Sequence, residues 1–137
     1  MKRTPLKRGN SKLKRTKIKK QSTQSIPSLK RKADRQLQDY YRTLNLKCMS
    51  CGKKADIVHH FYPKSSSSYL RYEDINLIPL CHKCHSLHHC FGDPSIHAII
   101  QNKKGEKWLA TLMVLRRKYL SINSKKFLNA IIEKYEI

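Results

Sequence analysis

The sequence predicts an α+β fold, in which a small zinc-stabilised core with flanking helices follows a disordered basic arm. Three observations lead to this prediction. Two C-x2-C pairs lie about thirty residues apart, a spacing that can close one zinc site. Short apolar segments beside these pairs have the length of strands, while later stretches carry apolar residues at helical spacing. Basic charge is concentrated in the first quarter of the chain.

The first 32 residues are basic and contain no acidic side chain. They carry 13 of the 30 Lys and Arg residues of a chain whose formal net charge is +21. Because such a segment buries too little apolar surface to fold alone, we expect a disordered arm over 1–32 and a folded domain over 33–137. A run of this kind is either a solubilising tail or a phosphate-binding arm, and the complete lack of acids favours the arm.

Basic residues recur in the arm as Leu-Lys-Arg units. An arm that neutralises backbone phosphates releases counterions, so it adds affinity without reading bases. We therefore expect a nucleic acid as the partner. The candidate contacts are Lys7, Arg8, Lys14, Arg15, Lys30 and Arg31.

Hydropathy indicates a protein outside the membrane. No apolar stretch is long enough to span a bilayer, and the basic N-terminus lacks the apolar core of a secretory signal. We therefore expect a cytoplasmic location. In that reducing compartment, five cysteines with two C-x2-C pairs indicate metal binding rather than disulfides.

The folded part begins with a predicted helix over 33–46. Its apolar side chains share one face: Ala33, Leu37, Tyr40, Tyr41 and Leu44. A tight turn follows at the first cysteine pair, and residues 55–58 then read as a short strand. After a polar loop, residues 76–80 read as a second extended segment.

Four helices are expected after the second strand. The first begins near the second cysteine pair and reaches residue 90. Asp93 and Pro94 are typical of a helix start, so the next helix covers 95–101. Two apolar stripes predict helices over 106–121 and 125–136, whose apolar residues are expected in the core.

Four cysteines form the clearest candidate site. Cys48 and Cys51 make one turn and Cys81 and Cys84 the other, and together they can surround a structural zinc ion. In so small a domain the metal would supply much of the folding free energy. Cys90 is the odd cysteine, expected as a free thiol unless it replaces one of the four ligands.

Histidines form a second candidate site. His59 and His60 precede the polar loop, and His85 and His89 follow the second cysteine pair at a spacing that places both on one side of a helix. His88 replaces His89 as a ligand if that helix is rotated. His82 and His97 lie outside this group and are expected at the surface.

This arrangement resembles the HNH nuclease motif. The resemblance covers residues 48–89: the pair His59-His60 followed by Phe61, then Asn76-Leu77, then Cys81-x2-Cys84-His85 with His89. It implies a ββα-metal fold held by the two C-x2-C turns. It also implies a DNA endonuclease that hydrolyses phosphodiester bonds.

The resemblance implies a role for each matching residue. His60 corresponds to the general base, and Asn76 to the residue that holds the loop carrying that base. His59, His85 and His89 correspond to ligands of a catalytic divalent metal, expected to be Mg²⁺ or Mn²⁺. Cutting both DNA strands symmetrically would favour a homodimer.

A narrower resemblance concerns the loop and the segment after the second helix. Tyr69 to Tyr72, Asn76-Leu77, Gly92-Asp93-Pro94 and Gly105-Glu106 are similar to the phage Rap/NinG recombination endonucleases. It implies branched DNA as substrate and a phage-infected bacterial cytoplasm as location. The residues alone leave a rival open, a non-catalytic zinc module that binds nucleic acid. A basic RNA-associated structural protein would explain the arm and the zinc site but not the histidines.

Overall fold

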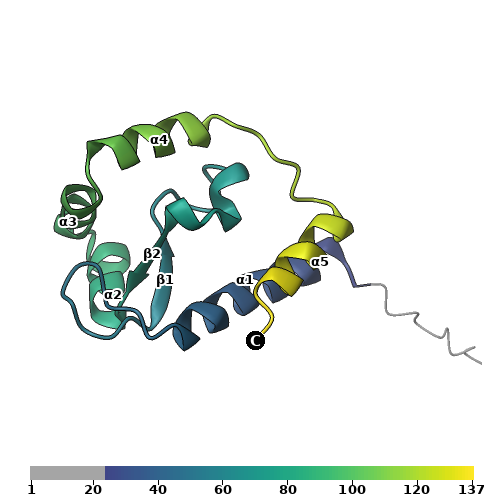
Figure 1. Ribbon diagram of the computed structural model, residues 1–137, viewed down its shortest axis with the longest axis horizontal. Helices are drawn as coiled ribbons and strands as arrows, with labels where there is room; N and C mark the ends of the chain where they lie inside the picture. Colours follow the sequence, from purple (N-terminus) through teal and green to yellow (C-terminus); the bar gives the residue numbers. More distant parts are fainter. Residues whose placement is uncertain (1–23) are drawn as a thin grey trace, which may run out of the picture.

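The computed structural model describes residues 24–137. Helices surround one small β-hairpin, so the expected α+β class is confirmed (Figure 1). No helix in the described part of the chain is long and apolar enough to cross a bilayer. The elements, in chain order, are α1 (Ile26–Thr43), β1 (Ile57–His60), the short 3-10 helices η1 (Tyr69–Tyr72) and η2 (Asp74–Asn76), β2 (Leu77–Leu80), α2 (His82–Phe91), α3 (Ser95–Lys104), α4 (Glu106–Arg116) and α5 (Lys125–Lys134).

The two strands pair in an antiparallel hairpin with Ile57 opposite Leu80. Pro79 has no N–H group to donate, and it lies opposite Val58. The Val58 N–H and C=O both bond to the side-chain amide of Gln38, at 2.9 and 2.8 Å, so they point away from β2. The proline therefore costs the hairpin no ladder bond, and Gln38 covers the free edge of β1.

The hairpin separates two hydrophobic clusters because successive side chains of a strand point to opposite faces. Helices α1 and α5 pack side by side over one face (Figure 1). Their cluster contains Leu29, Ala33, Leu37, Val58, Tyr72, Leu77, Leu128, Ile132 and Tyr135. The cysteine turns, α3 and α4 contribute to the other cluster, which contains Cys48, Phe61, Leu70, Ile78, Leu80, Cys81, Cys84, Ile96, Ile100 and Leu112.

Helix α1 begins seven residues earlier than expected, so the predicted boundary between arm and domain at residue 32 is wrong. The Ser25 hydroxyl accepts the Ser28 N–H at the helix start, and Pro27 occupies the first turn. Leu29 is buried with α5 in the same cluster. Residues 26–32 thus gain from tertiary packing the apolar burial that they lack by themselves.

The basic residues proposed as phosphate contacts fall into two groups. Lys30 and Arg31 lie on α1, where the Lys30 ammonium donates to the Asn123 side chain at 2.6 Å and Arg31 is exposed. The other four, Lys7, Arg8, Lys14 and Arg15, lie outside the described residues.

Several other boundaries differ by a few residues. The first strand runs over 57–60 rather than 55–58, and α3 continues to Lys104, where Gly105 adopts a φ of 86°. Helix α4 ends at Arg116 rather than 121 because the Leu120 N–H donates to the Ser68 hydroxyl, at 3.1 Å, instead of to a helical carbonyl. Helix α5 ends at Lys134, two residues short of the expected 136.

Truncating Leu128 tests the packing of α5 on α1. Its side chain is fully buried, so Leu128→Ala should lower the free energy of unfolding by about 2–5 kcal/mol. Leu44→Ala is the matched control, because Leu44 is 43% exposed at the end of α1. Its effect should stay within about 0.5 kcal/mol in the same denaturant titration. Equal losses in the two variants would contradict this packing.

Candidate active site

The four cysteines of the two C-x2-C pairs converge on one point. One sulfur atom from each of Cys48, Cys51, Cys81 and Cys84 lies within 4.8 Å of the other three. Cys51 Sγ and Cys81 Sγ are 3.6 Å apart. Tetrahedral zinc with Zn–S bonds of about 2.3 Å places its sulfur ligands about 3.8 Å apart, so the cluster fits a structural zinc ion.

Local backbone geometry aims both turns at this point. Lys47 and Lys54 form an isolated bridge around the first pair, and Gly52 takes a φ of 76°, which favours glycine. Cys81 caps α2, which places Cys84 one helical turn later on the same side. Cys90 is exposed near the far end of α2 and lies outside the cluster.

The protonation of two thiols differs with their surroundings. A backbone hydrogen bond from Lys53 lowers the pKa of Cys51 to about 7. Burial raises the pKa of Cys84 to about 12. Because thiolates are the zinc ligands, metal binding must displace the proton from Cys84, and it releases that proton at neutral pH.

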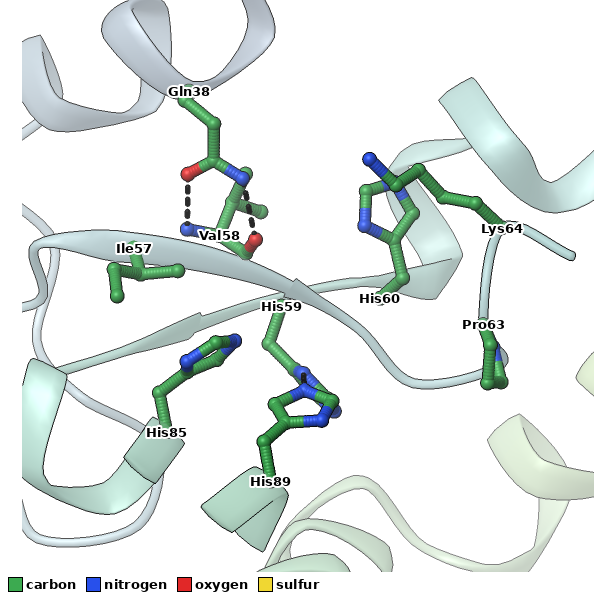
Figure 2. Close-up of a pocket in the computed structure, with 9 residues that line it drawn as sticks. All are labelled: Gln38, Ile57, Val58, His59, His60, Pro63, Lys64, His85 and His89. Carbon is green, nitrogen blue, oxygen red and sulfur yellow. Dashed lines mark hydrogen bonds between the residues drawn. The ribbon is translucent and has the colours of Figure 1, made fainter. Parts of the chain in front are cut away.

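The predicted histidine ligands also come together. His59 is 3% exposed on the face of β1 that α2 covers, and His85 and His89 project toward it from α2 (Figure 2). His59 Nδ1 and His89 Nε2 are 3.2 Å apart, and all three residues offer a nitrogen within 4.8 Å of the others. Two imidazoles on one tetrahedral ion lie about 3.3 Å apart, so the geometry fits a metal.

Two further histidines, His88 and His97, lie next to His59. His97 of α3 was expected at the surface, and that expectation is wrong: its Nε2 is 3.0 Å from His59 Nε2. Gly92, with a φ of 64°, ends α2 and allows α3 to fold back so that His97 stacks on His88. His59, His88 and His97 therefore make a second set of three nearby nitrogens. His82 is exposed, as expected.

Burial favours the neutral form of four of these histidines, His59, His85, His89 and His97. Burial, reinforced by the neighbouring histidines, lowers the pKa of His59 to about 3 and the pKa of His97 to about 4. Burial lowers the pKa values of His85 and His89 as well. These four rings consequently present lone pairs rather than positive charges, which is what a metal ion requires of its ligands.

His60 projects to the other side of β1 from His59 (Figure 2). Its Nε2 lies 2.8 Å from the backbone oxygen of Arg71. A carbonyl oxygen only accepts, so the proton of neutral His60 is on Nε2 and the lone pair is on Nδ1. Burial lowers the pKa of His60 below its ordinary value, which favours the neutral ring with an unprotonated Nδ1, the form that a general base requires.

Asn76 joins the two sides of the loop between the strands. Its side-chain amide donates to the backbone oxygens of Tyr62 and Leu70, at 3.0 and 3.1 Å, and its oxygen accepts the Tyr62 N–H at 2.8 Å. The residue is fully buried, so these bonds are shielded from water. They fix the segment that follows His60 directly.

An ion-pair network that the sequence did not indicate supports the same loop from α1. One oxygen of Asp34 accepts from Arg71 at 2.7 Å and from Lys64 at 3.0 Å, and the other accepts the Tyr72 hydroxyl. Burial opposes ionisation of Asp34, but Lys64 and Arg71 outweigh it and lower its pKa. Because Arg71 also provides the carbonyl that binds His60, Asp34 helps to fix the ring of the candidate base.

A cleft of about 280 Å³ crosses the free edge of β1 and is lined by residues from both faces of the strand (Figure 2). His59, His85 and His89 line it on one side of the strand, and His60 and Lys64 line it on the other. Gln38, Ile57, Val58 and Pro63 complete the lining. A group bound across the strand edge would therefore meet three histidines that could hold a metal, one neutral imidazole and one ammonium.

Breaking one zinc ligand tests the cysteine cluster. Cys81→Ser should show weaker thiolate-to-cobalt charge-transfer absorption than the wild type on Co²⁺ substitution, because one of four thiolate ligands is gone. It should also unfold at a much lower temperature, since structural metal contributes on the order of 10 kcal/mol to small zinc domains. Cys90→Ser, which changes a thiol outside the cluster, should match the wild type in both measurements. Wild-type behaviour of Cys81→Ser would contradict a four-cysteine metal site.

Neutralising Asp34 tests the network beneath the base. Asp34→Asn removes the charge shared by Arg71 and Lys64, and should lower the free energy of unfolding by about 1.5–3 kcal/mol. Asp39→Asn on the same helix removes only an exposed pair with Arg42 and should cost about 0.5 kcal/mol or less. Chemical denaturation of the two variants measures the difference, and equal values would show that Asp34 carries no such role.

The described residues thus hold a four-cysteine cluster of the kind that binds zinc and, apart from it, a cleft lined by three histidines that could hold a metal and by the neutral His60. In comparisons with known proteins, the chain matches no family model, no curated protein and no solved structure.

Proposed function

We propose that this chain is a metal-dependent DNA endonuclease of the HNH type. One observation carries the proposal: a three-imidazole metal set and a neutral histidine with a free Nδ1 lone pair line the same cleft. Hydrolysis of a phosphodiester needs both parts, a base for water and a positive centre for the phosphate. The order of two antiparallel strands followed by α2 is the order expected of a ββα core and supports this proposal.

His60 acts as the general base. The Arg71 carbonyl holds its Nε2–H, so Nδ1 accepts the proton of the attacking water. Asn76 and Asp34 keep the ring in place through Tyr62 and Arg71. Because side chains alternate along a strand, His60 and the ligand His59 lie on opposite faces of β1, and the scissile phosphate is expected to lie across the edge between them.

His59, His85 and His89 hold the catalytic divalent ion. When bound, the ion supplies a Lewis acid that polarises the scissile phosphate and stabilises the leaving oxygen. Three neutral imidazoles suit transition metals better than Mg²⁺, which prefers oxygen ligands. Of the two ions expected from the sequence, the donor set therefore favours Mn²⁺ over Mg²⁺.

The positive charge supports DNA as the substrate. The net charge of +21 favours a polyanion, and Lys64 brings an ammonium into the cleft itself. The basic residues of the first 32 positions would add contacts to the backbone phosphates that carry no base specificity. Branched recombination intermediates are the substrate that the narrower family resemblance proposes.

His60→Ala tests the reaction. Its rate of DNA cleavage should fall about 100-fold or more, because a positioned base contributes that much, whereas DNA binding should be unchanged. Labelled linear duplex and four-way junction are cut by the wild type and the variant with Mn²⁺, Mg²⁺, Co²⁺ or Zn²⁺, and with EDTA. Fluorescence anisotropy measures binding to the same two substrates.

The matched control is His82→Ala, which removes an exposed histidine of α2 outside the cleft. This variant should cut at the wild-type rate. Binding without cutting by the wild type, with every metal, would contradict the endonuclease and favour the non-catalytic zinc module. Full activity of His60→Ala would refute the assignment of the base.

A further inference from the structure

His97 is the residue of the cluster whose position is most constrained. Its ring is stacked between two others, with the Phe61 centroid 4.3 Å away on one side and the His88 centroid 4.1 Å away on the other. Both stacks are within 16° of parallel. A ring clamped in this way cannot swing, so the direction of its Nε2 is fixed toward His59 Nε2, 3.0 Å away.

Two neutral imidazoles at that distance form one hydrogen bond between their Nε2 atoms. Each ring has a single N–H and a single in-plane lone pair, so one Nε2 donates and the other accepts. If His59 donates from Nε2, its lone pair is on Nδ1, which faces His89 at 3.2 Å. If His59 accepts instead, its Nδ1 carries the proton and cannot bind a metal beside His85 and His89.

We infer that His97 is a positioning residue, which accepts the Nε2–H of His59 and thereby directs the His59 Nδ1 lone pair to the metal held with His85 and His89. This inference rests on the proposed function, because it assumes that these three residues bind the ion. Histidine ligands commonly donate their other N–H to an oxygen acceptor, and here a neutral imidazole takes that place.

The ring stack also argues against a metal between His88 and His97. An imidazole binds a metal in the plane of its ring, and two stacked, nearly parallel rings 4.1 Å apart have no shared in-plane point. His88 therefore supports the His97 ring by stacking. Its buried Nδ1 makes no hydrogen bond among residues 24–137.

The direct test replaces the acceptor while keeping the stack. His97→Phe retains an aromatic ring between Phe61 and His88 but cannot accept a hydrogen bond. With zinc in the cysteine site, the histidine site is titrated with Co²⁺ and followed by its visible absorption. The dissociation constant should rise about 10- to 100-fold, with the number of cobalt ions bound unchanged.

Two further variants separate positioning from packing. His97→Gln offers an amide oxygen as acceptor, so it should recover part of the lost cobalt affinity. His88→Phe keeps the stack and removes a ring nitrogen that the inference leaves out of coordination, so it should bind cobalt like the wild type. Wild-type affinity in His97→Phe would overturn the inference. Loss of a bound cobalt ion in both His88→Phe and His97→Phe would overturn it in favour of a second metal site.

A measurement without substitution covers the case in which a variant does not fold. Long-range ¹H–¹⁵N correlation spectra of the wild type distinguish the two neutral tautomers of each histidine. His59 should carry its proton on Nε2 and His97 on Nδ1, whereas the reverse assignment would overturn the inference. Cleavage assays run in parallel keep the two proposals apart. A wild type that binds cobalt through His59 Nδ1 without cutting DNA contradicts only the endonuclease, and one that cuts while His97→Phe keeps full affinity contradicts only the role of His97.

Discussion

The convergence of four cysteines is the constraint on which the rest of this small fold depends. The hairpin has only two short strands, too few for stability in water without further support. The cysteine cluster ties the turn before β1 to the junction of β2 with α2. That junction sets the direction of α2, and hence whether His85 and His89 face His59. A metal at this cluster would therefore stabilise the fold and orient the histidines together.

The two faces of strand β1 carry different residues of the candidate site. The face toward α2 presents the three imidazoles that could hold a metal, and the face toward α1 presents His60 within the network of Asp34, Arg71 and Lys64. The Gln38 side chain hydrogen-bonds the N–H and C=O of Val58 on the free edge of β1. Without these bonds, the two groups could pair with a further strand. The cleft thus stays open to a ligand that reaches both faces.

Sequence reasoning identified the groups whose spacing is local. Both C-x2-C pairs and the i, i+4 histidines of α2 come together in the structure because one turn or one helix positions each pair. The role of His97 depends on the angle between α2 and α3, which no local pattern encodes, although Gly92 after a helix is a signal that the chain reverses there. The early start of α1 was missed because Leu29 gains its burial only from α5. Asp34 and Arg71 are far apart in sequence, so no local pattern predicts that they pair.

In the proposed reaction, a metal on three histidines and the base His60 act on one phosphate across the edge of β1. Anomalous diffraction from a crystal with Mn²⁺ and a non-cleavable duplex can locate both the ion and the phosphate. We expect a manganese peak within bonding distance of His59, His85 and His89, contacting a backbone phosphate that His60 Nδ1 also faces. A manganese ion elsewhere, or DNA bound away from this cleft, would contradict it.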